Sequence, residues 1–217
     1  MIHYDKFLNS SIKNVKPSGI RKFFSIAEEM DNVISLGVGE PDFLTPWHIR
    51  NVAIDYLDKG ATRYTANAGL IALREEIANF YSRKYNISYD PKSEVLVTVG
   101  GSEGIDMAIR TLIDPGDEVL LVEPSFVCYR PIAETCGAKV ISLTTKAENG
   151  FKLMPDEIEN AVTPKTKLLI LPYPNNPTGA VMRKEDLGRD LQRTDLRKKY
   201  ALLDRIHPRH ERAHDRD

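Results

Sequence analysis

The chain has 217 residues, of which 41% are hydrophobic, and its 30 basic and 31 acidic residues nearly cancel. This length suits one domain or one and a half, and the balanced charge gives no electrostatic reason to expect a nucleic-acid or membrane partner. The apolar runs, at most about five residues, are far shorter than a bilayer requires, and the N-terminus lacks the apolar core of a signal peptide. The two cysteines do not suggest a disulfide framework. We therefore expect a cytoplasmic protein.

The first half of the chain is predicted to be mainly helical. Residues 48–59 and 69–85 carry apolar side chains at the spacing of one helix face. Gly60 follows the first of these segments, as is common just after a helix end. Residues 94–99, with the sequence EVLVTV, form a short apolar run that favours a buried strand.

Strands and helices alternate in the second half of the chain. Apolar runs predict strands at 118–123, 139–143 and 167–172, and helices are expected at 102–113, 126–136 and 154–162. Short apolar strands separated by helices are typical of a parallel sheet that is covered on both faces. The sequence therefore predicts an α/β fold of three layers, with a mostly parallel sheet between two layers of helices.

The pattern is lost in the last part of the chain. About half of the residues from 188 to 217 are charged, and this composition predicts a solvated or disordered tail without a buried strand. His207, His210 and His214 lie close together in the tail, but Pro208 interrupts the helical register between the first two. We therefore expect no metal site there.

The end of the strand predicted at 94–99 carries residues suited to binding a phosphate. Gly100 and Gly101 would let the backbone approach a ligand, and the first N–H groups of the following helix lack partners within that helix. Ser102 could cap this helix or donate its hydroxyl. Glu103 would contribute only its N–H, with its side chain pointing away. A tight turn followed by a helix cap would explain the same residues without a ligand.

A second strand end is followed by LPYPNNPTGAVM, residues 171–182. Its three prolines would hold the amide of Asn176 rigidly, and the Asn176–Pro177 bond is a candidate for the cis form. Phe126, just after the strand predicted at 118–123, could stack on a flat cofactor. A proline-rich turn and ordinary core packing are the alternatives. Taken together, the two strand ends predict a phosphate-bearing cofactor with an oxygen to which Asn176 donates.

Segments of this chain resemble the N-terminal half of class I aminotransferases of the aspartate and aromatic group. These enzymes use pyridoxal phosphate and have fold type I. The matching segments are ISLGVGEPDFLTP, GATRYTANAGLIALREEIA, VLVTVGGSEGIDMAIRTLIDPGDEVLLVEPSFVCYRP and LPYPNNPTGAVM, which cover residues 20–187 almost without a break. The resemblance implies an N-terminal arm and the start of a small domain at 1–45, part of the large cofactor-binding domain at 46–187, and an unmatched tail at 188–217.

The resemblance also implies roles for the matching residues. Gly101, Ser102 and Glu103 would bind the cofactor phosphate of their own subunit. Phe126 would stack on the pyridine ring. Asn176 would lie beside the substrate and hydrogen-bond the phenolic oxygen of pyridoxal phosphate, which favours the ionised oxygen.

Two further positions have implied roles in substrate binding and in a homodimer. Gly39 would offer its backbone to the substrate carboxylate. Tyr64 would reach the cofactor phosphate of the neighbouring subunit, although a purely structural tyrosine beside a turn is an open alternative. The implied substrates are an amino acid and a 2-oxo acid.

The family's catalytic lysine and aspartate are expected downstream of the Asn-Pro-Thr-Gly motif. The lysine forms the Schiff base, and the aspartate pairs with the pyridine nitrogen. Asp204 lies near the expected distance but lacks the Glu and the aromatic residue that follow in the family, while Lys198 and Lys199 stand in the charged tail. We therefore expect no catalytic residue in this chain and hypothesise that it is truncated or frame-shifted after about residue 187.

The activity of the chain is accordingly left open. By resemblance it is an aminotransferase, and as given it is expected to be inactive. The alternative is a catalytically dead cofactor-binding remnant or the product of a pseudogene. A carbon–sulfur lyase on the same scaffold is the alternative chemistry, because the motifs present are shared.

Overall fold

The computed structural model describes residues 6–13, 15, 19, 26, 34, 39, 42–183, 186 and 201–202. The chain divides into two compact units. One comprises Lys16–Val97, and the other comprises Met1–Val15 together with Thr98–Asp217. Within the described ranges, no helix has the length and apolar character needed to cross a membrane.

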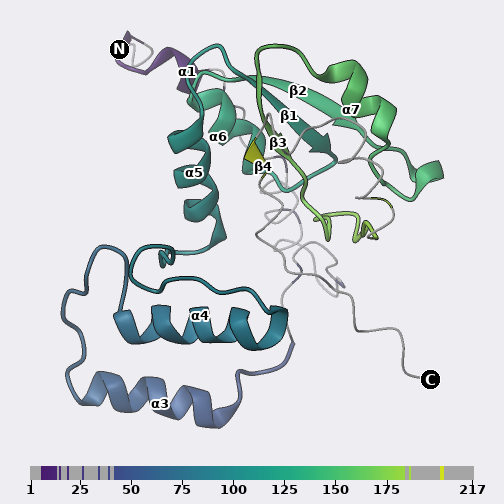
Figure 1. Ribbon diagram of the computed structural model, residues 1–217. Helices are drawn as coiled ribbons and strands as arrows, with labels where there is room; N and C mark the ends of the chain where they lie inside the picture. The colour runs from purple at the N-terminus through teal and green to yellow at the C-terminus, as the bar shows by residue number, and fades with distance from the viewer. Residues whose placement is uncertain are drawn as a thin grey trace, which may run out of the picture. The chain divides into compact units, whose positions relative to one another are not determined.

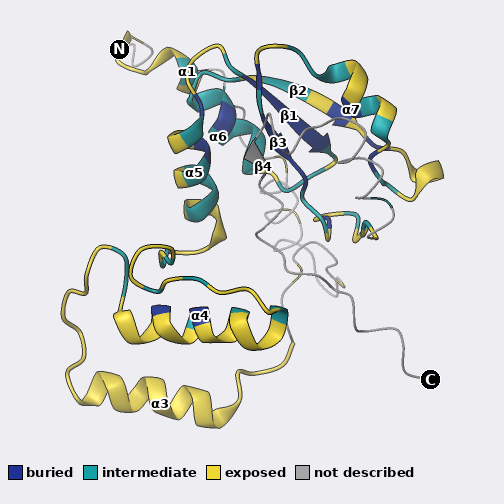
Figure 2. Ribbon diagram, in the orientation of Figure 1, coloured by how far each residue is buried: buried dark blue, intermediate teal, exposed yellow. Residues whose placement is uncertain are grey.

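The unit Lys16–Val97 contains both helices predicted in the first half of the chain. They are α3 (Trp47–Asp58) and α4 (Ile71–Tyr85). Before α4, Gly69 has φ +94° and a Cβ at this position would lie 2.7 Å from the Cβ of Val97, so the close approach requires glycine. The described side chains of α3 are exposed, whereas α4 buries Arg74 and Ala78 (Figure 2).

The prediction of a strand at 94–99 is wrong. A strand is defined by a ladder of hydrogen bonds to a neighbour. Val97 N–H donates to the carbonyl of Ala68 at 3.1 Å, and Leu96 and Val99 are exposed. An apolar run gives the tendency to form a strand, but the described part of the chain supplies no neighbouring strand for these residues.

The unit that includes Thr98–Asp217 is built on a parallel sheet (Figure 1). The strands lie in the order β2-β1-β3-β4, and each neighbouring pair is parallel. They are β1 (Glu118–Glu123), β2 (Lys139–Thr144), β3 (Thr166–Ile170) and β4 (Ala201–Leu202). The first three confirm the predicted strands, although β3 ends at Ile170, shortly before Pro172, which cannot donate to a ladder.

Strand β4 corrects the expectation for the tail. Ala201 and Leu202 pair in parallel with Leu168 and Leu169 of β3. The sequence predicts no buried strand between residues 188 and 217, and the structure has a short strand there at Ala201–Leu202. The run YALL, residues 200–203, is too short among charged residues to predict a strand, and it is pairing with β3 that makes Ala201 and Leu202 one.

Helices cover both faces of the sheet, as predicted. They are α5 (Gly101–Leu112), α6 (Tyr129–Thr135) and α7 (Pro155–Ala161). Alternate side chains of β1 enter two separate cores, because successive strand residues point to opposite faces. Leu120 and Val122 pack in the core that contains Ile158 of α7. Val119 and Leu121 pack in the core that contains Ile109 of α5 and Ala133 of α6, which establishes three layers (Figures 1 and 2).

Helix α6 is shorter than the 126–136 that the sequence predicts. It begins at Tyr129, so Phe126 lies in a loop between β1 and α6. Two short elements lie outside the predictions, α1 (Ser10–Lys13) and the 3₁₀ turn η2 (Ala147–Asn149). Neither has the apolar periodicity that predicts an element from sequence.

The strand order places a topological switch point between β1 and β3. From β1 the chain passes to β2 on one side, and it then returns to β3 on the other side of β1. In open parallel sheets, a crevice for ligands forms beyond the carboxyl ends of the strands at such a point. The loops that follow β1 and β3 carry Phe126 and Asn176, respectively.

Candidate functional site

The N-terminus of α5 presents free backbone donors. The residue before the helix, Gly100, has φ +84°, a conformation that favours glycine, and no described side chain caps the helix. A Cβ on Gly101 would meet no atom within 4 Å, so its backbone faces open space. First-turn N–H groups without intrahelical partners, at the positive end of a helix dipole, can hold an anion such as a phosphate.

Neither Ser102 nor Glu103, at the start of α5, acts as the N-terminal cap of this helix. Ser102 is not the cap that the sequence allowed, because α5 begins one residue earlier, at Gly101. Against the rise that burial causes, its hydroxyl lowers the pKa of the Cys128 thiol, which places the two side chains near each other. Glu103 accepts a hydrogen bond from the backbone N–H of Val99, so its carboxylate is directed at the residues before the helix.

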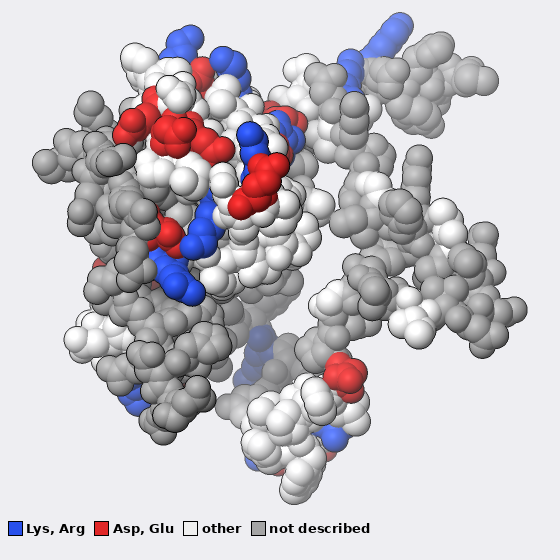
Figure 3. Space-filling model, turned by 90° about the vertical axis from the view of Figure 1, so that its right-hand side faces the viewer, with Lys and Arg blue, Asp and Glu red and all other residues white. Residues whose placement is uncertain are grey.

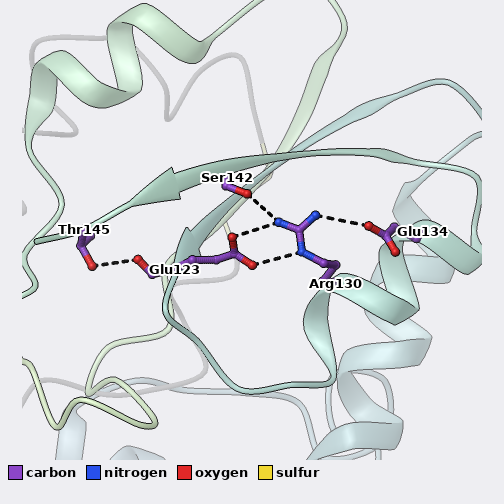
Figure 4. A network of polar contacts seen from close by, with 5 residues as sticks. All are labelled: Glu123, Arg130, Glu134, Ser142 and Thr145. Atoms are coloured by element: carbon purple, nitrogen blue, oxygen red, sulfur yellow. Dashed lines mark hydrogen bonds and ion pairs between the residues drawn. The ribbon is translucent and has the colours of Figure 1, made fainter. Parts of the chain in front are cut away.

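The loop between β1 and α6 is held at both ends by one polar network (Figure 4). The guanidinium of Arg130 donates to the carboxylate of Glu123 through Nε at 3.1 Å and lies 3.0 Å from it through Nη2. Arg130 also donates to Glu134 at 3.2 Å and to the Ser142 hydroxyl at 2.6 Å. The carbonyl of Glu123 accepts from the N–H and hydroxyl of Thr145 at 2.8 and 2.9 Å. Charge-assisted bonds of this kind are among the strongest between side chains.

Phe126 lies in the loop that this network holds. Its ring is half-buried and meets Tyr129 edge to face, with centroids 6.1 Å apart. Phe126 is a member of neither core described above, so ordinary core packing does not account for its place. Two residues further on, burial raises the pKa of the Cys128 thiol, and the hydrogen bond with Ser102 opposes this shift.

The loop after β3 separates its two asparagines. Asn176 is exposed, and within the described ranges its side chain has no hydrogen-bond partner. Asn175 is buried, at 7% exposure, and donates from Nδ2 to the carbonyl of Pro124 at 3.0 Å. The Asn176–Pro177 peptide bond is cis, which confirms the prediction. An exposed amide on a held loop is available to a ligand, whereas the buried amide serves the protein.

Three segments distant in sequence meet at the switch point. Ser102, at the start of α5, lies close enough to Cys128 of the loop after β1 to oppose the rise that burial causes in the pKa of its thiol. Asn175, of the loop after β3, contacts Pro124 of that same loop. The structure thus brings the surroundings of Gly101, Phe126 and Asn176 into one region. A phosphate donor set, an aromatic ring and a free amide fit a flat, phosphate-bearing group such as pyridoxal phosphate.

Gly39 and Tyr64 belong to the other unit, Lys16–Val97. Both are exposed, and a Cβ on Gly39 would meet no atom within 4 Å. Their implied roles toward a substrate carboxylate and toward the phosphate of a neighbouring subunit stay predictions.

Sequence reasoning missed Asn175 and the Arg130 network. Arg130 and Glu134 have the i, i+4 spacing of a helical ion pair, which could have been read from the sequence. The bonds from Arg130 to Ser142 and from Asn175 to Pro124 could not, because only the parallel pairing of strands brings those residues together.

The residues considered for catalysis and metal binding lie mostly outside the described ranges. These are Asp204, Lys198, Lys199 and the three histidines of the tail. Strand β4 ends at Leu202, two residues before Asp204 in the sequence. Within the described ranges, no cluster of three or more His, Cys, Asp or Glu residues is arranged to hold a metal ion.

Charged side chains of both signs are intermixed on the face shown in Figure 3. Three of the ion pairs join the start of one strand to another segment of the sheet unit. Lys139 lies 3.0 Å from Glu118, and Lys167 lies 3.0 Å from both Asp114 and Asp117. An ion pair with an exposed partner such as Asp114 contributes little to stability, whereas the carboxylate of Glu118 is buried.

Comparisons with known proteins show the family to which this chain is similar. The sequence profile of the family described as aminotransferase class I and II matches residues 31–213. The aspartate aminotransferase of Pyrococcus abyssi is 47% identical over 173 residues, which are 80% of this chain and 44% of that protein. The aromatic-amino-acid aminotransferase 2 of Thermococcus litoralis is 45% identical over 180 residues, 83% of this chain and 46% of that protein.

A solved structure gives the same result for the fold. The aspartate aminotransferase from Rhizobium meliloti superposes with a TM-score of 0.82 at 32% identity, covering 90% of this chain and 50% of that one. The chain spans about half the length of the curated relatives it matches. The profile match continues past residue 188, where the apolar pattern is lost, and covers most of the sequence. The chain therefore belongs to the class I and II aminotransferase family, whose members use pyridoxal phosphate.

Proposed function

We propose that this chain binds pyridoxal phosphate at the carboxyl ends of β1 and β3, and that the protein transfers an amino group from an amino acid to a 2-oxo acid. The observation that carries the proposal is the convergence of three segments at the switch point: the free N-terminus of α5, the Phe126 loop and the Asn176 loop. When bound, pyridoxal phosphate supplies an electron sink for bonds broken at the Cα atom of an amino acid.

Each segment has a separate task in this proposal. The first N–H groups of α5, around Gly101 and Ser102, hold the phosphate. Phe126 covers one face of the pyridine ring and excludes water from it. Asn176 donates to the phenolic oxygen and thereby favours its ionised form. Glu103 contributes its backbone N–H, since its carboxylate already accepts from Val99.

The remaining proposals concern the oligomeric state and the cellular location. In a homodimer, Tyr64 would bind the phosphate held by the neighbouring subunit, and Gly39 would face the substrate carboxylate. The exposure of both residues is compatible with such contacts. Cys128 and Cys136 are free thiols, which supports a reducing, cytoplasmic location.

The residues proposed to bind the phosphate and the ring lie upstream of the position of the family's Schiff-base lysine. The family's lysine in a Ser-x-x-Lys context is not found after the Asn-Pro-Thr-Gly motif in this sequence. The residues that bind the phosphate and the ring are all present, so affinity for the cofactor does not depend on that lysine alone.

A titration followed by chemical reduction tests the proposal. The purified chain is titrated with pyridoxal phosphate, and binding is followed by cofactor absorbance in the presence and absence of inorganic phosphate. We expect saturable binding that inorganic phosphate weakens by competition. Borohydride reduction and mass spectrometry then show whether a lysine is modified. Failure to bind would contradict the proposed site, and modification of one specific lysine would identify a Schiff-base partner within this chain.

A further inference from the structure

The buried side chain of Asn175 connects the two loops that carry the ring-binding residues. Its Nδ2 group donates to the carbonyl of Pro124 at 3.0 Å, across the boundary between the loop after β3 and the loop after β1. Pro124 stands two residues before Phe126, and Asn175 stands one residue before Asn176. This bond therefore joins the backbone on either side of the switch point.

The same amide also shapes its own loop. Its Oδ1 atom accepts from the N–H of Thr178 at 3.1 Å and from the Thr178 hydroxyl at 2.9 Å. The backbone of Asn175 donates to Ala180 at 2.8 Å and accepts from Gly179 at 2.8 Å. Because the oxygen is fixed by Thr178, the Nδ2 group has a fixed direction, and it points at Pro124.

The other end of the Pro124 backbone is held independently. The carbonyl of Glu123 accepts two bonds from Thr145, and the carboxylate of Glu123 is bonded to Arg130. The hydrogen bond from Asn175 to Pro124 thus joins this fixed loop after β1 to the loop after β3. A buried amide with its donor and its acceptor both satisfied specifies one arrangement, since any other would leave a polar group unpaired.

We propose that Asn175 is a positioning residue for the cofactor ring. It holds the loop of Phe126 at a fixed distance from the loop of Asn176, so that ring stacking and donation to the phenolic oxygen occur together. Asn175 itself does not contact the cofactor. The proposal deepens the proposed function and rests on it for the identity of the ligand, but the connection between the loops can be tested without any ligand.

Replacement of Asn175 by aspartate tests the Nδ2 donor separately from the size and the acceptor oxygen of the side chain. Asn175→Asp keeps the shape of the side chain and the oxygen that accepts from Thr178. It removes the donor and turns an oxygen toward the Pro124 carbonyl. Protonation of this carboxyl in acid restores one O–H donor. Asn160→Asp is the matched control, because Asn160 is exposed on α7 and the change of charge is the same.

Cys128 reports on the loop after β1 in the absence of cofactor. The chain has two cysteines, so Cys136→Ala leaves a single half-buried thiol within residues 124–129. In this background we expect Asn175→Asp to raise the rate at which dithiodipyridine modifies Cys128 by roughly tenfold near neutral pH, the effect of losing one buried hydrogen bond. The excess over the parent rate should shrink near pH 4, where the new carboxyl is protonated. Asn160→Asp should follow the parent at both pH values.

The second measurement, of ligand affinity, tests binding of the cofactor ring separately from binding of its phosphate. Asn175→Asp should weaken binding of pyridoxal phosphate while leaving the inhibition constant of inorganic phosphate unchanged, because phosphate alone needs only the N-terminus of α5. A general loss of structure would weaken both. If the parent chain binds no pyridoxal phosphate, the proposed function fails, yet the Cys128 rates still decide whether Asn175 holds the two loops.

Two results would overturn the inference. One is a Cys128 modification rate in Asn175→Asp equal to that of the parent. The other is equal weakening of pyridoxal phosphate and inorganic phosphate. Should Asn175→Asp fail to fold by circular dichroism, Thr178→Ala removes the hydroxyl that orients the amide. It should then raise the Cys128 rate by a smaller factor, and an unchanged rate in Thr178→Ala would also count against the role of Asn175.

Discussion

Adjacent asparagines in the loop after β3 have opposite surroundings, although the sequence presents them as a pair. Asn175 is buried with its amide satisfied, and Asn176 is exposed with its amide free of described partners. A buried polar group that loses its partner costs far more than an exposed one. Substitutions at the two positions should therefore change different properties of the protein.

Asn176→Ala should impair cofactor binding and leave the fold intact. We expect the affinity for pyridoxal phosphate to fall roughly ten- to a hundredfold, the effect of removing a hydrogen bond to a charged oxygen. The thermal midpoint should stay within about a degree of the parent, because the side chain is exposed. Absorbance titration and calorimetry check the two parts. Asn160→Ala is the control, and an equal loss of affinity in it would contradict a specific role for Asn176.

Arg130→Met should destabilise the sheet unit through the network of Figure 4. The substitution leaves the carboxylates of Glu123 and Glu134 without their cation, at a site where Arg130 is only 34% exposed. We expect a loss of about 1 to 3 kcal/mol in the free energy of unfolding, measured by urea denaturation.

The control for Arg130 is Arg110→Met on α5. Arg110 also forms an i, i+4 pair, with Asp106 at 2.7 Å, but its side chain is 58% exposed. Exposed helical pairs contribute about 0.5 kcal/mol or less. Similar losses in the two variants would show that the network around Glu123 has no special role.

At the scale of elements, Glu118 ties together the beginnings of neighbouring strands. Its buried carboxylate accepts from the hydroxyl of Thr163 at 2.6 Å and from Lys139 of β2 at 3.0 Å. The hydrogen bond from Thr163, followed by that from Lys139, holds the pKa of Glu118 below its ordinary value. Because the unfolded chain then binds more protons between the two pKa values, stability rises with pH across that window.

The acid sensitivity of the sheet unit should therefore depend on Glu118. As the pH falls from about 5 toward the lowered folded-state pKa, the parent should lose stability. Glu118→Gln should be less stable than the parent near neutral pH and should lose less on acidification. Urea denaturation at several pH values measures both effects. Glu159→Gln, at an exposed position on α7, is the control. An identical pH dependence in parent and Glu118→Gln would refute the assignment.

Most elements could be predicted from the sequence, and the two wrong expectations about strands have one cause. Helices α3, α4 and α5 and strands β1, β2 and β3 carry their apolar pattern within a few residues, so local reasoning finds them. The segment 94–99 has the apolar pattern of a strand, but no described strand pairs with it. Strand β4 pairs with β3 but lacks that apolar pattern. Strand formation depends on pairing with a distant segment, which periodicity does not reveal.

At the scale of the whole molecule, burial is unevenly distributed between the two units (Figure 2). The strands β1 and β3 are almost wholly buried, whereas the described side chains of α3 are exposed. Few buried apolar contacts mean a low free energy of local opening. The unit Lys16–Val97 should accordingly open more readily than the sheet unit.

Hydrogen exchange of the full chain tests this difference. Backbone amides of α3 should exchange at least about a hundredfold faster than those of β1, as followed by mass spectrometry of peptides covering Trp47–Asp58 and Glu118–Glu123. Helix α5, with one face packed under the sheet at Ile109, serves as an internal reference for a protected helix. Equal protection of α3 and β1 would mean that contacts within the unit Lys16–Val97 stabilise it more than burial indicates.

The sequence by itself determined the family, the three-layer α/β class and the residues proposed to bind a cofactor, because motifs such as Gly-Gly-Ser before a helix and Asn-Pro-Thr-Gly after a strand act through local backbone geometry. The tertiary structure decided which of these residues come together. Parallel pairing in the order β2-β1-β3-β4 sets the Phe126 loop beside the Asn176 loop, and it turns Asn175 from a second asparagine into the contact between them. Hydrogen bonds between segments far apart in the chain exist only once the strands have aligned, so no local pattern encodes them.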